Sequence, residues 1–238
     1  MNPLAGEASP SVLHRRNLDL WEQTFANRSW GRYPPEELVR FVMRTFGKAL
    51  DRRAVSFLEV GCGPGANLWY LVREGFKVCG IDGSPTAIRQ ARARLEAEGL
   101  LSDPAAVDLR QGDFATLPWA DQSFDAVIDI EAVYANEWQV IASCLQEIHR
   151  VLKPGGIFFG KMFGTKTSGF GTGRQIEEGT YVNVTVGSCA GFGITHFFSE
   201  AELRRLYARF SSLSLDWVHR TDHGGTAEVF EWLVTAKK

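Results

Sequence analysis

The chain has 238 residues, of which 45% are hydrophobic and 23% are charged, so its composition excludes a disordered or fibrous protein. Its 26 basic and 28 acidic side chains give a formal net charge of -2, which argues against nucleic acid as a partner. No apolar run approaches the ~20 residues that a membrane helix needs, and we expect no membrane partner.

The cysteines and the amino-terminal residues indicate a compartment. The four cysteines are scattered without a C-x-x-C pair, which argues against a zinc site and against a disulfide framework. The first residues lack the apolar stretch of a secretory signal. We therefore expect a cytoplasmic protein with no bound metal.

Two helices are expected before the first strand. A helical pattern starts at Ser11 and stops before residues 27–33, and a second helix opens at Pro34-Pro35-Glu36-Glu37. Proline suits the first turn of a helix, and the acids favour the positive end of its dipole. Because these helices precede the sheet, we expect residues 1–50 to form a cap over its carboxyl edge.

Short apolar runs then alternate with helical segments. Helices of 10–15 residues between buried strands predict right-handed βαβ units and a parallel sheet covered on both faces. The expected strands are residues 54–61, 77–82, 107–113, 124–130 and 156–163.

The carboxyl-terminal third has a different pattern. Ser199-x-x-Glu202 is a capping box that opens a helix to about Phe210. Residues 213–221 and 227–237 then predict an antiparallel pair of strands. Together with residues 54–163 this gives a doubly wound, Rossmann-like α/β fold. We expect a mostly parallel seven-stranded sheet that ends in an antiparallel hairpin strand.

A glycine-rich insertion, residues 164–195, precedes this helix. Eight glycines lie between Gly164 and Gly193, together with only four formal charges. Long glycine-rich connections inside a compact domain are often lids or binding loops. The sequence favours a lid, and a flexible surface insertion is the alternative.

A glycine-rich turn, Glu59-Val60-Gly61-Cys62-Gly63-Pro64-Gly65, follows the first strand. Gly61 can make the tight turn, Gly63 lets a ligand approach the backbone, and the helix after Gly65 offers unpaired N–H groups. Asp82 ends the second strand, where a carboxylate can accept hydrogen bonds from both hydroxyls of a ribose. Gly61-x-Gly63-x-x-Ala66 also satisfies the dinucleotide pattern, so NAD is an alternative ligand.

Three further features decide between the ligands. Glu59 lies two residues before the first glycine, and Asp113-Phe114 places an acid with an aromatic ring after the third strand. Leu152-Lys153-Pro154-Gly155-Gly156 precedes the fifth strand. From about Phe57 to Phe163 the chain thereby resembles the class I S-adenosylmethionine-dependent methyltransferases, and residues 196–203 resemble them more weakly.

The resemblance implies an enzyme of residues 51–238 that uses S-adenosylmethionine and releases S-adenosylhomocysteine. It implies that the glycine turn holds the methionine portion, that Asp82 binds the ribose, and that Asp113 accepts from the adenine amino group. The residues after the fourth strand would pass beside the methionine and face the substrate. The expected cofactor-binding residues in this domain are Glu59, Gly61, Cys62, Gly63, Gly65, Asp82, Gly83, Asp113, Phe114 and Ile130.

The expected cap adds residues to this site. In similar enzymes such a cap often contacts the methionine end of the cofactor. Trp30, Arg32 and Tyr33 combine aromatic rings with a guanidinium that suits a carboxylate. Arg32 can instead pair with a neighbouring acid, which is the structural alternative.

Methyl transfer is an in-line displacement in which positioning supplies much of the catalysis. Oxygen and nitrogen acceptors also call for a general base, for which Glu131, Tyr134 and His196 are the candidates, with His14 as a further histidine. A lone histidine such as His196 is more often structural. A cap with a glycine-rich insertion favours a small-molecule acceptor. The alternatives are a protein side chain and an NAD-binding protein.

Overall fold

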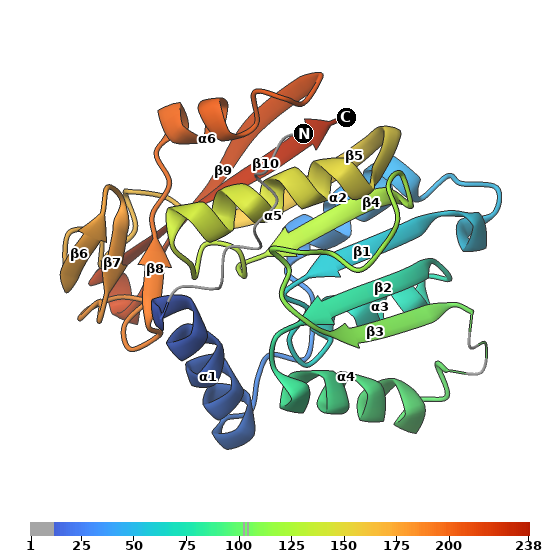
Figure 1. Ribbon diagram of the computed structural model, residues 1–238, viewed down its shortest axis with the longest axis horizontal. Helices are drawn as coiled ribbons and strands as arrows, with labels where there is room; N and C mark the ends of the chain where they lie inside the picture. Colours follow the sequence, from blue (N-terminus) through green and yellow to red (C-terminus); the bar gives the residue numbers. More distant parts are fainter. Residues whose placement is uncertain (1–11, 102, 104) are drawn as a thin grey trace, which may run out of the picture.

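The computed structural model describes residues 12–101, 103 and 105–238. These residues form a seven-stranded sheet between two layers of helices (Figure 1), which confirms the predicted doubly wound α/β fold. The strands of this sheet are β1 (Ser56–Val60), β2 (Lys77–Asp82), β3 (Val107–Gln111), β4 (Phe124–Ile130), β5 (Leu152–Phe163), β9 (Ser212–Asp222) and β10 (Ala227–Lys237).

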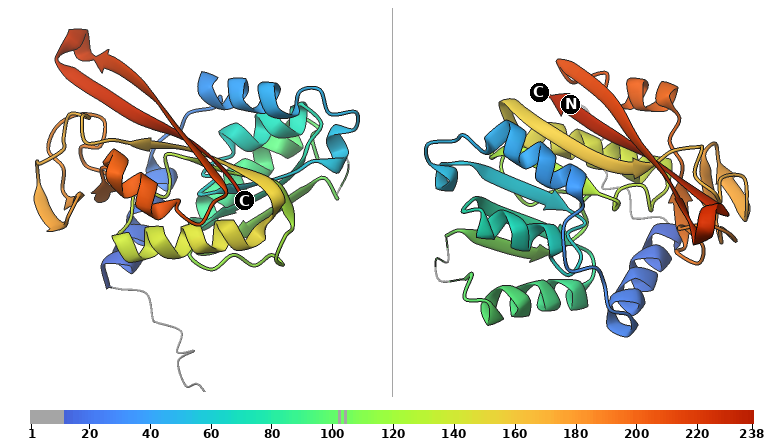
Figure 2. Two further views of the ribbon diagram at one scale, coloured as in Figure 1. Left: turned by 90° about the horizontal axis from the view of Figure 1, so that it is seen from above. Right: turned by 180° about the vertical axis from the view of Figure 1, so that it is seen from behind.

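The strand order is β3-β2-β1-β4-β5-β10-β9. The first five strands pair in parallel, whereas β10 is antiparallel to both β5 and β9. The order reverses between β1 and β4, and open α/β sheets bind ligands outside the carboxyl ends of the strands at such a switch point. The β9–β10 hairpin extends beyond the rest of the sheet (Figure 2).

Helices cover both faces of the sheet because each face carries buried apolar side chains. The helices α2 (Glu36–Phe46), α3 (Ala66–Arg73) and α4 (Pro85–Ala97) share one hydrophobic cluster with the strands. The helices α5 (Trp138–Val151) and α6 (Glu200–Leu206) belong to the cluster on the other face. The capping box of Ser199 and Glu202 begins α6 as predicted, but the helix ends at Leu206, short of Phe210.

The two amino-terminal helices have separate roles, so the expected cap of residues 1–50 is wrong for its second helix. Leu38 and Val42 of α2 are fully buried, and the ring of Phe41 stacks on Phe159 of β5 at 4.5 Å between centroids. The single apolar face of α2 is thus buried on the sheet. Only α1 (Val12–Asn27) lies beyond the carboxyl ends of the strands (Figure 1).

The glycine-rich insertion contains structure that the sequence did not indicate. It forms a small antiparallel sheet of β6 (Arg174–Glu177), β7 (Thr180–Val182) and β8 (Ile194–His196). Tyr181 is buried, and its ring centroid lies 5.7 Å from that of Phe170 within the same insertion. The insertion therefore has its own packed side chains and differs from an open surface loop.

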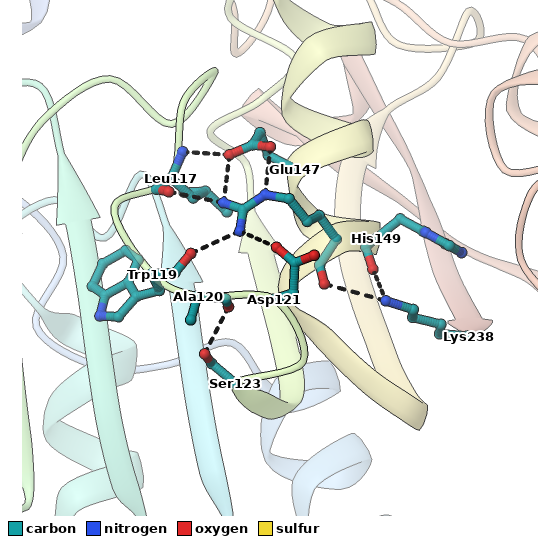
Figure 3. A network of polar contacts seen from close by, with 9 residues as sticks. Leu117, Trp119, Ala120, Asp121, Ser123, Glu147, His149 and Lys238 are labelled. Carbon is teal, nitrogen blue, oxygen red and sulfur yellow. Dashed lines mark hydrogen bonds and ion pairs between the residues drawn. The ribbon is translucent and has the colours of Figure 1, made fainter.

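Arg150 of α5 fixes the segment between β3 and β4 through hydrogen bonds to Leu117 and Trp119, which Figure 3 labels. Its guanidinium donates to the carbonyl oxygens of Leu117 and Trp119 at 2.9 and 2.8 Å, and to the carboxylates of Asp121 and Glu147. Glu147 in turn accepts from the Leu117 N–H at 2.8 Å. This network holds the loop that begins with the predicted adenine-binding residues.

Three further findings concern the described residues as a whole. They contain no group of three or more histidines, cysteines or acids placed to hold a metal ion. No helix among them is long and apolar enough to cross a membrane. The four cysteines are buried and unpaired.

Candidate functional site

The glycine turn between β1 and α3 lies at the switch point and depends on left-handed backbone. Gly61 has a φ of +65°, and a Cβ at this position would lie 2.2 Å from the Cβ of Ala132. Gly63 has a φ of +49°, and its Cβ would extend toward Phe25 of α1 at 3.5 Å. Glycine therefore permits the close approach of the two loops and leaves space above the turn.

Asp82 ends β2 and joins the two loops beside this space. One of its carboxylate oxygens accepts from the Gly63 N–H and the other from the Ser84 N–H, both at 2.8 Å. Burial raises the pKa of Asp82 to about 6, although these two hydrogen bonds oppose the shift. Each oxygen keeps a further lone pair, so the carboxylate can still accept from the hydroxyls of a ligand.

Glu59 lies at the base of the same space and is 1% exposed. Its Oε1 accepts from the Asn67 side-chain amide at 2.6 Å, and no described residue gives Oε2 a hydrogen-bond partner. Burial raises the pKa of Glu59 to about 8, with smaller contributions from Asp129 and Asp82. A ligand that brings a positive charge would satisfy this carboxylate and favour its ionised form.

A pocket encloses these groups between the turn and α1. Ten of the predicted site residues line it: Trp30, Glu59, Gly61, Cys62, Gly63, Asp82, Gly83, Phe114, Ile130 and Glu131. The wall also includes residues that the sequence analysis did not select, namely Asn17, Leu18, Trp21, Phe25, Pro64, Ala66, Asn67, Ser84, Ala132 and Asn136.

The missed residues of α1 share one helical face. Asn17, Leu18, Trp21 and Phe25 recur at intervals of one, three and four residues, and all four line the pocket. The apolar part of this pattern was visible in the sequence as a helix. The surface against which this apolar face packs could not be predicted from the sequence, because such a face packs equally well on a sheet.

Polar contacts attach α1 to the loops around the pocket. The Asn17 side-chain amide donates to the Ala135 carbonyl oxygen at 2.6 Å. The carboxylate of Glu22 accepts from the hydroxyl of Ser84 and from the Thr86 N–H, the latter at 3.1 Å. Glu22 thereby adds negative charge at the amino terminus of α4, where the helix dipole is positive.

His14 at the start of α1 contacts the predicted adenine-binding acid. Its Nε2 lies 2.7 Å from Asp113 Oδ2, and its Nδ1 lies 3.2 Å from Asn136 Oδ1. The hydrogen bond to Asp113 raises the pKa of His14, while burial opposes the shift. Asp113 also accepts from the Ala115 N–H at 2.8 Å, and it does not line the pocket. In this arrangement the carboxylate anchors α1.

The remaining cap and turn residues lie at different distances from the pocket. Arg32 is 69% exposed on its side chain and lines a neighbouring surface groove, 4.0 Å from Glu98. Tyr33 is 72% exposed, and its ring packs edge-on against Trp69. Gly65 is the N-cap of α3 and lies outside the pocket wall. Of the three expected cap residues, only Trp30 reaches the pocket.

The two other catalytic candidates are joined through the backbone, since the His196 N–H donates to the Tyr134 carbonyl oxygen at 2.9 Å, and neither lines the pocket. Tyr134 is buried against Phe163, and burial raises its pKa well above the usual range. His196 is fully buried in β8, with Nδ1 2.7 Å from the Thr180 hydroxyl, and it does not line the pocket. Burial lowers the pKa of His196 to about 4. This geometry favours a packing role for His196.

The family model and the relatives that match this chain are all described as methyltransferases. Residues 58–160 match the family model described as a methyltransferase domain. The chain is 31% identical over 160 residues to the probable phthiotriol/phenolphthiotriol dimycocerosates methyltransferase 2 of Mycobacterium ulcerans, covering 61% of this chain and 58% of the relative. It is 44% identical over 103 residues to the sterol 24-C-methyltransferase ERG6B of Gibberella zeae, covering 42% and 26%. The chain therefore spans less than two thirds of these relatives.

A solved structure extends the comparison to the whole fold. The 1,6-didemethyltoxoflavin-N1-methyltransferase of Burkholderia thailandensis superposes with a TM-score of 0.67, covering 100% of this chain and 92% of that chain. It was crystallised with 1,6-didemethyltoxoflavin and S-adenosylhomocysteine. At 17% identity the likeness concerns the fold alone.

Proposed function

Because the chain belongs to the class I S-adenosylmethionine-dependent methyltransferases, we propose that it moves a methyl group from this cofactor to an oxygen or nitrogen atom of a small molecule. The relatives are longer than this chain, so the activity is inferred from the chain's own pocket. The pocket lies at the switch point, where the fold family binds its ligands.

One observation carries the proposal, namely the charge of the pocket wall. Glu59, Asp82 and Glu131 line it, and no lysine or arginine does so among the described residues. A wall of this kind favours a ligand with positive charge, such as a sulfonium and an ammonium group. It disfavours the pyrophosphate of NAD, because two negative charges would lie beside these acids with no basic side chain in the described wall to pair with them.

The polar groups of the pocket fit the proposed cofactor. Asp82 supplies acceptor positions for ribose hydroxyls, and the unpaired Oε2 of Glu59 can accept from an ammonium group. The Oδ1 atoms of Asn17 and Asn67 are also buried without hydrogen-bond partners among the described residues. These orphaned acceptors surround one cavity, which supports a polar, hydrogen-bond-donating ligand there.

The protein's contribution to the reaction is positioning, exclusion of water and proton removal. The cofactor supplies a methyl group on a sulfonium, which is electrophilic before it binds. Trp21 and Phe25 of α1 cover the pocket with apolar surface, which limits the access of water. Glu131 lines the pocket at the end of β4 and is placed to accept a proton from the acceptor. Tyr134 stays a neutral phenol at ordinary pH, because burial raises its pKa well above the usual range.

The acceptor class has a second candidate. Leu18, Trp21, Phe25 and Trp30 give one side of the pocket an apolar, largely aromatic surface. This surface favours an apolar acceptor, and one relative is named as a sterol 24-C-methyltransferase. A carbon atom of a lipid is therefore the alternative acceptor to an oxygen or nitrogen atom. A protein side chain is less consistent with a pocket covered by α1.

Calorimetric titration with S-adenosylmethionine, S-adenosylhomocysteine and NAD tests the proposal. We expect S-adenosylhomocysteine to bind in the micromolar range or better and NAD to bind negligibly. Asp82→Ala should weaken the binding of S-adenosylhomocysteine by ~1.5–3 kcal/mol, the range for hydrogen bonds to a charged group. NAD binding as tight as that of S-adenosylmethionine, or unchanged binding in a folded Asp82→Ala variant, would contradict the assignment.

A further inference from the structure

One ammonium group and two carboxylates form a cluster beside the pocket. Lys161 Nζ lies 2.8 Å from Glu131 Oε1 and 3.0 Å from Glu231 Oε2. The side chains of Lys161 and Glu231 are 9% and 1% exposed, whereas that of Glu131 is 34% exposed and lines the pocket. The cluster therefore connects the pocket with a carboxyl group that is buried in the sheet.

The sheet topology brings these three residues together from distant parts of the sequence. The Glu131 N–H donates to the Lys161 carbonyl oxygen at 2.9 Å, which extends the pairing of β4 with β5. On the other side of β5, Glu231 of β10 pairs with Phe163. Lys161 is two residues before Phe163 and points to the same face, so it is a diagonal neighbour of Glu231. Adjacent strands thus supply all three groups.

The backbone at Glu131 is held in an unusual conformation. Its φ is +55°, a region that L-residues rarely adopt. The carboxylate of Asp129 accepts from the N–H groups of Ala132 and Val133 at 3.0 and 3.1 Å, which fixes the turn around Glu131. Such strain persists where the surrounding structure imposes it, and it gathers at functional sites.

The charges of the cluster do not balance when both carboxyls are ionised. One ammonium faces two carboxylates; Glu231 Oε2 is paired with Lys161, whereas Oε1 has no hydrogen-bond partner among the described residues. Burial raises the pKa of Glu231 to about 7, and the charge of Glu131 adds to this shift. Other titratable groups that act on the cluster are Arg220 of β9, Tyr134, Asp129 and Cys189 of the insertion.

We infer that Glu131 and Glu231 act as one proton-accepting unit, in which Glu131 faces the methyl acceptor and Lys161 and Glu231 are positioning residues. The inference rests on the proposed function. Glu131 takes the proton from the acceptor's O–H or N–H as the new bond to the methyl group forms. The S–CH3 bond breaks, its electron pair stays on sulfur, and the sulfonium becomes a neutral thioether. The second carboxyl of the unit stabilises the proton in the water-poor pocket.

This unit has a consequence that can be measured without the acceptor. With one shared proton the cluster is neutral, and after loss of that proton it carries one negative charge. A negative charge beside the pocket favours the sulfonium of S-adenosylmethionine over the uncharged sulfur of S-adenosylhomocysteine. The preference for the methyl donor over the product should therefore increase as pH rises through the pKa of Glu231, which is about 7.

The experiment measures the ratio of the two dissociation constants by calorimetry between about pH 6 and about pH 8.5. In the unsubstituted protein we expect the preference for S-adenosylmethionine to rise about tenfold, as for charges ~10 Å apart at an effective dielectric constant of 20. Glu231→Gln should remove the part of the rise that the cluster contributes and leave the part that comes from Glu59 and Asp82. Glu59, Asp82 and Asp129 remain in the variant, so the difference between the two proteins isolates Glu231.

Glu228→Gln is the matched control, because Glu228 is an exposed acid on the same strand. It should keep the full rise. An identical rise in Glu231→Gln, or its loss in Glu228→Gln, overturns the inference. If Glu231→Gln does not fold, Glu131→Gln replaces it, since Glu131 is partly exposed, and the same loss is expected. Failure of both ligands to bind at any pH would instead contradict the proposed function.

Discussion

The amino-terminal helix and the glycine-rich insertion both lie near the carboxyl edge of the sheet, but they relate to the pocket in different ways. Helix α1 lines the pocket with Asn17, Leu18, Trp21 and Phe25. The insertion contributes no residue to the described pocket wall, and it contacts α1 instead. Phe192 stacks on Trp21 with 5.7 Å between ring centroids and an angle of 8°.

This difference shows which kind of segment can cover a ligand. A helix presents a continuous row of side chains at fixed spacing, and α1 is attached at both ends through His14 and Glu22. The insertion packs behind it, where a Cβ at Gly193 would lie 2.6 Å from Leu20. We therefore assign the covering role to α1 and a supporting role to the insertion.

The largest expected effect is a difference in pH dependence between two buried histidines, His14 of α1 and His196 of β8. The pKa of His14 is raised, so its contribution to stability is full below about pH 6.5 and is lost as pH rises through its folded-state value. The pKa of His196 is lowered to about 4. Its neutral form therefore contributes fully to the free energy of unfolding above about pH 6.5. This contribution falls as pH decreases from there to about 4, by on the order of 3 kcal/mol.

Denaturant unfolding of His14→Gln and His196→Gln at about pH 5, 7 and 9 measures these contributions. The stability lost in His14→Gln should shrink toward high pH, and the loss in His196→Gln should shrink toward low pH. Glutamine keeps a hydrogen-bonding side chain without the titration. Slopes of the same sign in the two variants would contradict the opposite environments of the two histidines.

The next effect concerns the stacked rings of Trp21 and Phe192. Trp21→Ala removes an aromatic wall of the pocket and should weaken S-adenosylhomocysteine binding by about 2 kcal/mol, through lost apolar contact. Phe192→Ala removes the partner outside the pocket and should weaken binding by less than about 1 kcal/mol. Calorimetry on both variants makes the comparison. Equal effects would show that the insertion takes part in binding as much as α1 does.

A smaller effect should follow from loosening one end of α1. Glu22→Ala removes the carboxylate that accepts hydrogen bonds from Ser84 and Thr86. It should lower the free energy of unfolding by about 1 kcal/mol, because the carboxylate is partly exposed. Hydrogen exchange should become faster across residues 12–27 while the sheet is unchanged. Gln23→Ala, on the exposed side of the same helix, is the control. Faster exchange in both variants would mean that Glu22 has no specific part in holding α1.

The smallest effect is the response of the two regions to ligand. S-adenosylhomocysteine should slow amide exchange in residues 12–33 more than in residues 164–193, because α1 and Trp30 line the described pocket and no residue of 164–193 does. The hairpin at residues 222–225 should change little. Exchange measured by mass spectrometry with and without S-adenosylhomocysteine tests this order. Greater protection of the insertion than of α1 would reverse our assignment of the covering role.

The sequence alone determined the sheet and the centre of the pocket. Strand β4 and the glycine turn were predicted because apolar runs, glycine and a terminal acid are local patterns with local causes. The capping box of Ser199 and Glu202 was predicted for the same reason, since its two hydrogen bonds join residues three apart. Local hydrogen bonding and steric freedom decide these features, and they are present in the sequence itself.

Only the tertiary structure decided which segments meet. Helices α1 and α2 both carry apolar side chains at helical spacing, yet α1 lies over the pocket and α2 lies on the sheet beside Phe159. The contact of His14 with Asp113 spans 99 positions, and Lys161 joins Glu131 to Glu231 across three strands. Such contacts depend on strand order and on competition between apolar surfaces for the same face, and no local pattern encodes either.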